Sequence, residues 1–369
     1  MKKLPKALLE EWMRQYYFTT TLDIGSSGVR TFSLAELRKL ADITQIELDA
    51  VFFNDSWTSG SIGLRQAIAN RWGNGQPNTV MVGNGSNEIL YMLASTILNP
   101  NDEVVILQPY YHVLWTIAEN IGCQIKWWKL LPENHFKPNI DDLKSLITPK
   151  TKLIAVNFPH NPTGISITRQ QQDELIRAAS EVGAYLIWDA AFEDIVEKEP
   201  LPNPCLIYKN AISIGTLSKG YGLPGIRIGW CFAPSEIIED CMQLRDYMTL
   251  YVSPLLEIVG QRAIEKLDRL LDIRMQEVQL NLSILEKWIE KHKSYVEWVK
   301  PNGGVTAFVK IIGQSDTEEF CRCLAKKHSV MLVPGNCFGY PQYVRLGFGA
   351  STEEFKKGLD YLSVHLADS

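Results

Sequence analysis

The chain has 369 residues, of which 46% are hydrophobic and 21% are charged, with a formal net charge of −5 at pH 7. This length suits one large domain and a smaller one, and the negative charge argues against a surface built for nucleic acid or an anionic membrane. No window holds the roughly 18 uninterrupted apolar residues of a membrane helix. We therefore expect a cytoplasmic protein whose partners are a small-molecule substrate and a second copy of itself.

Short β-branched segments alternate with helical stretches through the middle of the chain. The expected strands are residues 79–82, 103–108, 152–158, 184–189, 211–216 and 226–232. Such alternation predicts a mostly parallel sheet covered by helices on both faces.

The last third of the chain has a different pattern. A long, charged, periodic helix is expected first, with a kink whose place the pattern does not give. It is followed by strands in VTAFVKI, SVMLVPG and YVRLGF, which with two helices predict a small α+β domain. The predicted division is an N-terminal arm and part of the small domain at 1–40, a large domain at 41–255, and a connecting helix with the small domain at 256–369.

The cysteines predict neither a disulfide framework nor a metal site, because they are odd in number and form no CxxC pair and no zinc-like spacing with His. They are Cys123, Cys205, Cys231, Cys241, Cys321, Cys323 and Cys337.

Polar residues follow three predicted strands: Asn161, Asp189 and Lys219. Ligands of open α/β sheets bind beyond the carboxyl ends of the strands, so these residues are candidates for a site. Alone, Asp189 could cap the next helix and Asn161 could belong to a simple turn. A lysine at the end of a buried strand, near Arg227, is costly unless it is neutralised or used covalently.

Pyridoxal 5′-phosphate (PLP) would explain this placement. Desolvation and neighbouring positive charge lower the pKa of a lysine, which leaves the Lys219 amine free to form a Schiff base with an aldehyde. Asp189 would then keep the pyridine nitrogen protonated, so that the ring withdraws electrons from the substrate.

The phosphate of this cofactor would bind where a glycine-rich loop opens a helix, because free N–H groups and the helix dipole favour an anion there. The loop residues are Gly85, Ser86 and Asn87. Hydroxyl groups of Thr216 and Ser218 and the guanidinium of Arg227 would complete this site.

Several motifs, in this order and spacing, resemble those of the fold-type I PLP enzymes, the aspartate aminotransferase superfamily. They are GSNE, QPYYH, NFPHNPTG, IWDAAFED, GTLSKGYGLPGIRIGW and VRLGFG. The resemblance covers about residues 20 to 365. It implies an α/β fold with a mostly parallel seven-stranded sheet between helices, a smaller α+β C-terminal domain, and a homodimer with the site at the subunit boundary.

The resemblance also implies roles for single residues. Tyr110 would stack on the cofactor ring as part of the catalytic set with Lys219 and Asp189. Asn161 would bind the ring hydroxyl or the substrate carboxylate, and Arg345 would hold the substrate α-carboxylate. The loop with Ser27 and Gly28 would close over the substrate.

Two positions depart from the family pattern. Phe192 stands where many members have a tyrosine that donates to the ring oxygen, which makes ordinary transamination less certain. Asp55 stands where many members present a tyrosine to the phosphate of the neighbouring subunit.

Together with the motifs above, the segments DIGSSGVRTFSLAELR, RDYMTLYVSPL and PNGGVTAF resemble those of capreomycidine synthase and of the enzymes that form enduracididine. This resemblance implies a PLP-dependent cyclodehydratase of a hydroxy-L-arginine in natural-product biosynthesis. The 4-hydroxy isomer, giving L-enduracididine, is favoured over the 3-hydroxy isomer, giving capreomycidine. The main alternative is a class I/II aminotransferase that uses a 2-oxo acid. A non-enzymatic PLP-binding regulator would need an appended helix-turn-helix, for which the sequence gives no signal.

An acidic or aromatic residue should face the guanidinium of such a substrate, and a histidine could deliver a proton to its leaving hydroxyl. For each of the candidates named next, a purely structural or surface role is the favoured alternative to such a contact. The candidates for the guanidinium are Glu11, Asp23, Asp55, Trp57 and Glu193, and those for the proton are His112 and His160.

Overall fold

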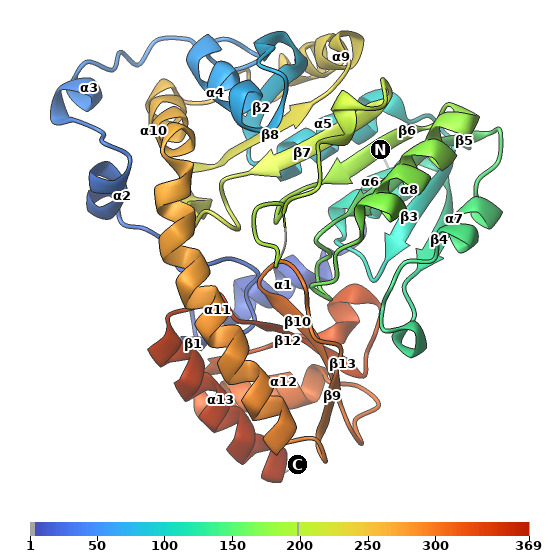
Figure 1. The fold of residues 1–369 in the computed structure, drawn as a ribbon, viewed down its shortest axis with the longest axis vertical. Helices are drawn as coiled ribbons and strands as arrows, with labels where there is room; N and C mark the ends of the chain where they lie inside the picture. The colour runs from blue at the N-terminus through green and yellow to red at the C-terminus, as the bar shows by residue number, and fades with distance from the viewer. Residues whose placement is uncertain (1–3, 198, 369) are drawn as a thin grey trace.

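In this computed structural model, which describes residues 4–197 and 199–368, a large sheet with its helices lies at one end of the molecule and a smaller sheet at the other (Figure 1). The long helix α11 (Leu267–Lys291) runs from one to the other. Among the described residues, no helix is long and apolar enough to cross a membrane.

The large sheet has seven strands in the order β2-β8-β7-β6-β5-β3-β4. Their bounds are β2 (Val80–Asn84), β3 (Glu103–Gln108), β4 (Gln124–Lys129), β5 (Thr151–Asn157), β6 (Tyr185–Asp189), β7 (Ala211–Thr216) and β8 (Ile228–Phe232). β8 is antiparallel to both of its neighbours, and the other pairs are parallel. The predicted mostly parallel, seven-stranded α/β sheet is confirmed.

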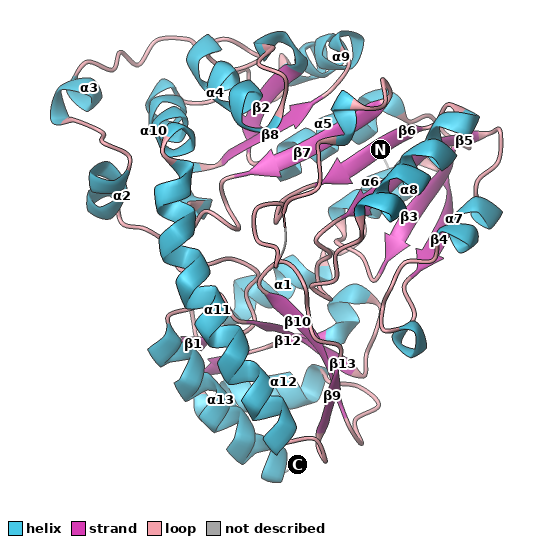
Figure 2. Cartoon of the chain, viewed as in Figure 1, coloured by secondary structure: helices cyan, strands magenta, loops and turns pink. Residues whose placement is uncertain are grey.

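Helices lie on both sides of this sheet (Figure 2). They are α4 (Ile62–Trp72), α5 (Ser86–Ile97), α6 (Val113–Ile121), α7 (Ile140–Leu146), α8 (Arg169–Val182) and α9 (Ser235–Arg245). Alternate side chains of a strand point to opposite faces. Val104 and Ile106 of β3 therefore pack in one hydrophobic cluster with α5, and Val105 and Leu107 pack in another with α8.

The predicted long helix is two helices, α10 (Pro254–Glu265) and α11. They are separated at Lys266, whose backbone leaves the helical region with φ −119° and ψ 23°. Two short helices, α2 (Leu34–Leu40) and α3 (Gln45–Asp49), each begin with a capping box.

The smaller body contains an antiparallel sheet in the order β12-β13-β10-β9 and a parallel pair of β1 with β11. The strands are β1 (Leu22–Asp23), β9 (Val296–Trp298), β10 (Thr306–Ile311), β11 (Val330–Met331), β12 (Val333–Pro334) and β13 (Tyr343–Gly347). Its helices are α1 (Leu8–Tyr16), α12 (Glu318–His328) and α13 (Thr352–Ala367). The domain limits at residues 40 and 255 stay a prediction.

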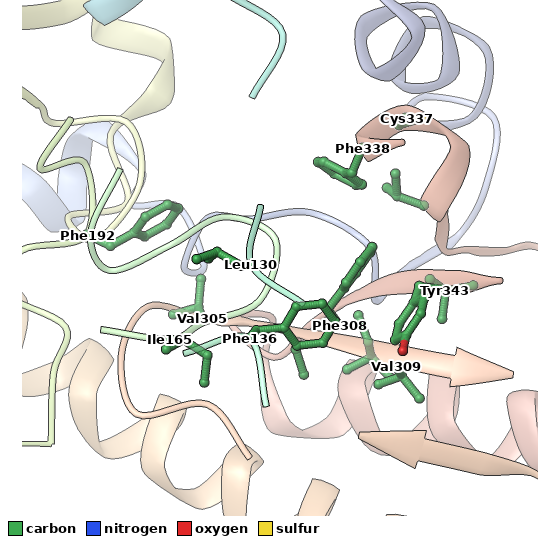
Figure 3. Close-up of a cluster of buried hydrophobic side chains, with 14 of the residues drawn as sticks. Leu130, Phe136, Ile165, Phe192, Val305, Phe308, Val309, Cys337, Phe338 and Tyr343 are labelled. Atoms are coloured by element: carbon green, nitrogen blue, oxygen red, sulfur yellow. The ribbon is translucent and has the colours of Figure 1, made fainter. Parts of the chain in front are cut away.

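Buried aromatic side chains connect the two bodies (Figure 3). Phe308 of β10 stacks on Tyr343 of β13 with ring centroids 4.8 Å apart. Phe136, from the loop after β4, meets Phe308 edge-on at 5.9 Å. Because aromatic pairs add to the free energy of area burial, this cluster holds the small sheet against the large one.

Candidate active site

Asp189 and Lys219 lie beyond the same edge of the large sheet. Asp189 is the last residue of β6, and Lys219 follows the end of β7 by three residues. The two strands are parallel neighbours, with Asp189 paired to Ile214. Both side chains therefore leave the sheet at its carboxyl end, where open α/β folds bind their ligands.

The Lys219 amine is half-buried and donates a 3.3 Å hydrogen bond to Oγ of Ser27. Burial, and after it the positive charge of Arg345, lower the pKa of this amine to about 8, against the opposing effects of Glu10 and Asp189. An amine with this pKa is partly neutral near pH 7, as a nucleophile or a base must be.

The Asp189 carboxylate is buried, with 5% of the residue exposed. Burial raises its pKa to about 6, although the N–H of Ala191, which donates to Oδ1 at 3.1 Å, and the charge of Lys219 lower it. Among the described residues no group hydrogen-bonds the second oxygen, Oδ2. The side chain thus helps to cap the following turn and still offers one oxygen to a cationic ring nitrogen.

Arg345 of β13 and Asn161, both predicted to be substrate contacts, meet in the interior, and their contacts with a substrate stay predictions. Arg345 is 2% exposed, and its Nε donates to the carbonyl of Gly25 at 3.0 Å while Nη1 donates to Oδ1 of Asn161 at 3.3 Å. Burial lowers the pKa of Arg345 to about 10. Its guanidinium remains charged at neutral pH and can hold a carboxylate.

Asn157, which the sequence analysis did not single out, positions Asn161. Its Oδ1 accepts the N–H of Asn161 at 2.7 Å, and its Nδ2 donates to the carbonyl of Asp189 at 2.9 Å. One sequence feature could have identified Asn157, because it is the polar last residue of the buried strand β5.

The start of α5 and the Arg227 guanidinium lie against each other. Gly85 precedes the helix with φ 90°, and a Cβ on it would lie 2.2 Å from Nη2 of Arg227. A Cβ on Gly229 would lie 2.4 Å from the backbone nitrogen of Ser86. These two glycines let a cation and the free N–H groups of a helix end come together, which is a favourable arrangement for a phosphate.

The other predicted phosphate contacts already have partners. Thr216 Oγ1 donates to Ser218 Oγ at 3.0 Å and accepts the N–H of Ser218 at 3.2 Å. Oδ1 of Asn87 accepts the hydroxyl of Tyr111 at 3.0 Å. Direct contacts of these three residues with the cofactor stay predictions.

The structure places Tyr111, and not Tyr110, at the cavity. The ring of Tyr110 packs between Trp115 and Trp127, with centroids 5.1 and 5.2 Å away. Tyr111 lines the cavity that holds Lys219. The sequence did not distinguish these two tyrosines, because they are adjacent and lie in the turn between β3 and α6.

The cavity has a volume of about 780 Å³ and is open on one side. Ser27 and Gly28 line it, as expected of substrate contacts, together with Lys219 and Arg345. Helix α1 contributes further lining residues, which include Glu10 and Met13. Sites for small molecules commonly have volumes of about 300–1,000 Å³, so a cofactor with an attached amino acid would fit.

Both departures from the family pattern can be located. Phe192 is buried in the hydrophobic core and does not line the cavity, so this position offers no hydroxyl to the cofactor. Asp55 accepts a hydrogen bond from the hydroxyl of Tyr251 on an exposed part of the chain. His160 contacts Thr163 and the carbonyl of Pro109 at 2.8 Å each. These contacts give His160 a structural role, which was the alternative to delivering a proton to the leaving hydroxyl.

Three independent observations indicate that these residues suit PLP. An amine with a lowered pKa, a buried carboxylate with one free oxygen, and a helix start beside a guanidinium all lie around the end of one sheet. The fold and site thus define an enzyme that can hold an aldehyde cofactor on a lysine.

Comparisons with known proteins agree with this class. The aminotransferase class I and II family matches residues 34–362. Capreomycidine synthase of Streptomyces vinaceus is 39% identical over 98% of this chain and 94% of its own. The chain belongs to the aminotransferase class I and II family, and the prediction of a PLP enzyme is confirmed.

Two solved structures are also similar over nearly their whole length. One is the PLP-dependent cyclase OrfR, with a TM-score of 0.95 and 38% identity over 100% of this chain and 98% of its own. The other is a PLP-dependent aminotransferase from Streptococcus suis, with a TM-score of 0.94 and 32% identity over 100% of this chain and 99% of its own. The predicted fold-type I architecture is confirmed.

We expect the capture of PLP by the cofactor-free protein to accelerate with pH around pH 8. Only the unprotonated Lys219 amine can attack the aldehyde, and burial places its pKa at about 8. The capture rate should therefore rise about fivefold from pH 7 to 8 and less than twofold from pH 8 to 9. Stopped-flow absorbance would measure this rate, with Nα-acetyllysine as the control for titration of PLP itself. A midpoint above pH 10 would contradict a buried, perturbed lysine.

Proposed function

We propose that this enzyme is a cyclodehydratase, which removes water from a hydroxy-L-arginine and closes a ring through the guanidine group. The observation that carries the proposal is the 39% identity to a capreomycidine synthase over 98% of the chain. The name of that relative gives capreomycidine as its product. It moves our expectation toward the 3-hydroxy isomer and away from the 4-hydroxy isomer that the sequence favoured.

The residues of the cavity suit the first part of this reaction. Arg345 would hold the α-carboxylate, and the Lys219 amine, once free, would take the proton from Cα. Bound PLP would supply the electron-withdrawing ring, and Asp189 would keep its nitrogen protonated. Tyr111, whose hydroxyl donates to Asn87, would cover the face of that ring.

The overall reaction balances without a second substrate. For the 3-hydroxy isomer the C–H bond at Cα and the C–O bond at Cβ break, and the hydroxyl leaves as water with one proton. A guanidine nitrogen then forms a bond to Cβ and loses its proton, and a proton returns to Cα. Holding the guanidine close to Cβ supplies much of the rate, because an intramolecular addition avoids the entropy of bringing two molecules together.

Transamination is the second candidate function. It is favoured by the 32% identity to the aminotransferase from Streptococcus suis over the full length of this chain. An aminotransferase would need a 2-oxo acid and would leave the cofactor in its amino form between half-reactions. The cyclodehydratase needs no co-substrate, and this difference separates the two functions.

A homodimer is part of the proposal. Large apolar side chains are exposed on the single chain, among them Phe52 at 79%, Phe53 at 81% and Trp57 at 70%, and Tyr247 is exposed at 91%. Exposed apolar patches of this kind are typical of surfaces that a partner covers.

The test is to incubate the PLP-loaded enzyme with synthetic 3-hydroxy-L-arginine and, separately, with the 4-hydroxy isomer, without a 2-oxo acid. We expect mass spectrometry to show loss of one water from the 3-hydroxy isomer, while the absorbance of the bound cofactor returns to its starting spectrum. Amino transfer on addition of a 2-oxo acid, with no dehydration of either isomer, would replace the cyclodehydratase by an aminotransferase.

A further inference from the structure

Charged groups of both signs line the cavity. Lys219 and Arg345 supply positive charge for the amino and carboxylate groups of the substrate, and Arg14 and Arg30 line it as well. The carboxylates that line the same cavity come from three separate elements. They are Glu10 of α1, Asp23 of β1 and Glu354 of α13.

Glu10 differs from the other two in having no partner. It is half-buried, and among the described residues no hydrogen bond or ion pair reaches its carboxylate. Arg14, one turn further along α1, also lines the cavity but is exposed and forms no ion pair with it. A carboxylate that is partly removed from water is costly unless it is paired, so a cationic ligand group would stabilise it.

Glu10 is also close to the reacting groups. Its negative charge acts on the pKa of three of them, opposing the lowering that burial causes at Lys219 and Arg345 and adding to the rise that burial causes at Tyr111. Glu10 lines the same cavity as these three residues, so a cation bound to Glu10 would lie in that cavity with the substrate's other contacts.

Asp23 and Glu354 are already used to fix the chain. Oδ1 of Asp23 accepts the N–H groups of Gly25 and Ser26 at 2.9 Å each, and Oε1 of Glu354 accepts the N–H of Asp23 at 3.3 Å. These bonds hold the loop whose Gly25 carbonyl contacts Arg345. The second oxygen of Asp23, Oδ2, accepts no bond from the described residues.

Within the single chain, most of the candidates named from the sequence do not line the cavity. Glu11 does not line the cavity and lies 3.7 Å from the amine of Lys6 on the outer side of α1. Asp55, Trp57 and Glu193 do not line the cavity either.

We propose that the Glu10 carboxylate binds the guanidinium of the substrate, with Oδ2 of Asp23 as a second acceptor, and thereby selects arginine-type side chains. This inference rests on the proposed function. A guanidinium presents pairs of parallel N–H groups that match a carboxylate, and such charge-assisted bonds are about twice as strong as neutral ones. Glu10 would also hold the guanidine in place for its attack on the side chain.

The test compares binding of L-arginine with binding of L-citrulline, which has the same shape and no charge. Neither ligand carries a hydroxyl that can leave, so no elimination follows, and the fast initial absorbance change of the PLP-loaded enzyme measures binding before any slower amino transfer. We expect the wild-type enzyme to prefer arginine. The Glu10→Gln variant should bind arginine about 10- to 100-fold more weakly and citrulline almost unchanged.

The matched control is Glu11→Gln, the next residue of the same helix, which should keep the wild-type preference. A double variant, Glu10→Gln with Asp23→Asn, tests the second acceptor, and its melting temperature shows whether the loop has survived. If wild type prefers arginine and both Glu10 variants keep that preference, the inference is overturned while the cyclodehydratase stands. If wild type itself shows no preference for arginine, the inference fails together with the arginine-type substrate.

Discussion

Replacing Lys219 with alanine is expected to lower turnover by roughly four orders of magnitude, because it removes both the covalent attachment of the cofactor and the base that takes the Cα proton. In the structure the amine makes one hydrogen bond, to Ser27, and its side chain is half-buried. The variant should therefore fold normally. Its melting temperature, turnover and cofactor absorbance measure these three effects separately.

A Lys219→Arg variant is the matched control, since it keeps the positive charge and cannot form the covalent bond. It should be as inactive as the alanine variant if chemistry, and not charge, is what Lys219 supplies. Added small primary amines should restore part of the activity of Lys219→Ala and none of that of Lys219→Arg, whose side chain fills the space. A Lys219→Ala enzyme with more than a tenth of wild-type turnover would refute the assigned role.

Much of this site could be predicted because the sheet fixes where its strands end. Asp189 and Lys219 end or follow neighbouring strands, so their convergence follows from topology alone. Arg345 lies in the smaller body of the protein. Its role in the site was predicted from the family resemblance and not from the local sequence pattern. The structure brings it to Asn161 at 3.3 Å.

Contacts between distant segments could not be predicted. Glu10 faces the cavity because α1 is held against the small sheet, where Nε1 of Trp12 donates to the carbonyl of Leu332 at 2.9 Å across 320 residues. Nothing in the local sequence shows which of the adjacent glutamates, Glu10 or Glu11, faces inward. The sequence could not distinguish Tyr110 from Tyr111 for the same reason, because side chains in a turn follow neither the helical nor the strand period.

Secondary structure was missed where local preference and tertiary context differ. The edge strand β4 reads QIKWWK, and its lysines and exposed first residue hide the alternation expected of a strand. The kink expected in the long helix could not be placed, because the break at Lys266 has no proline or glycine to mark it and the charged periodic pattern continues from α10 into α11.

Replacing Asp189 with asparagine is expected to lower kcat by roughly a thousandfold while leaving the fold intact. An asparagine oxygen can still accept the N–H of Ala191, which the aspartate accepts at 3.1 Å, so the local turn should keep its geometry. The amide carries no negative charge, and it would no longer favour a protonated ring nitrogen on the cofactor. The ring would then withdraw fewer electrons from Cα. Single-turnover measurement of Cα deuterium exchange isolates this step from ring closure.

The pH dependence distinguishes loss of charge from loss of shape at Asp189. Burial raises the pKa of the wild-type carboxyl to about 6 in the cofactor-free chain, and a protonated ring nitrogen beside it would lower that pKa, so the carboxyl gains a proton, and loses its effect on the ring, at or below pH 6. Wild-type kcat/KM should fall across that range, and the residual activity of Asp189→Asn should show no such step. An Asp189→Glu variant keeps the charge but moves the carboxylate by one methylene, so it should retain the step at lower activity. If the asparagine variant retained the same acidic step, another group would be responsible and Asp189 would act only in positioning.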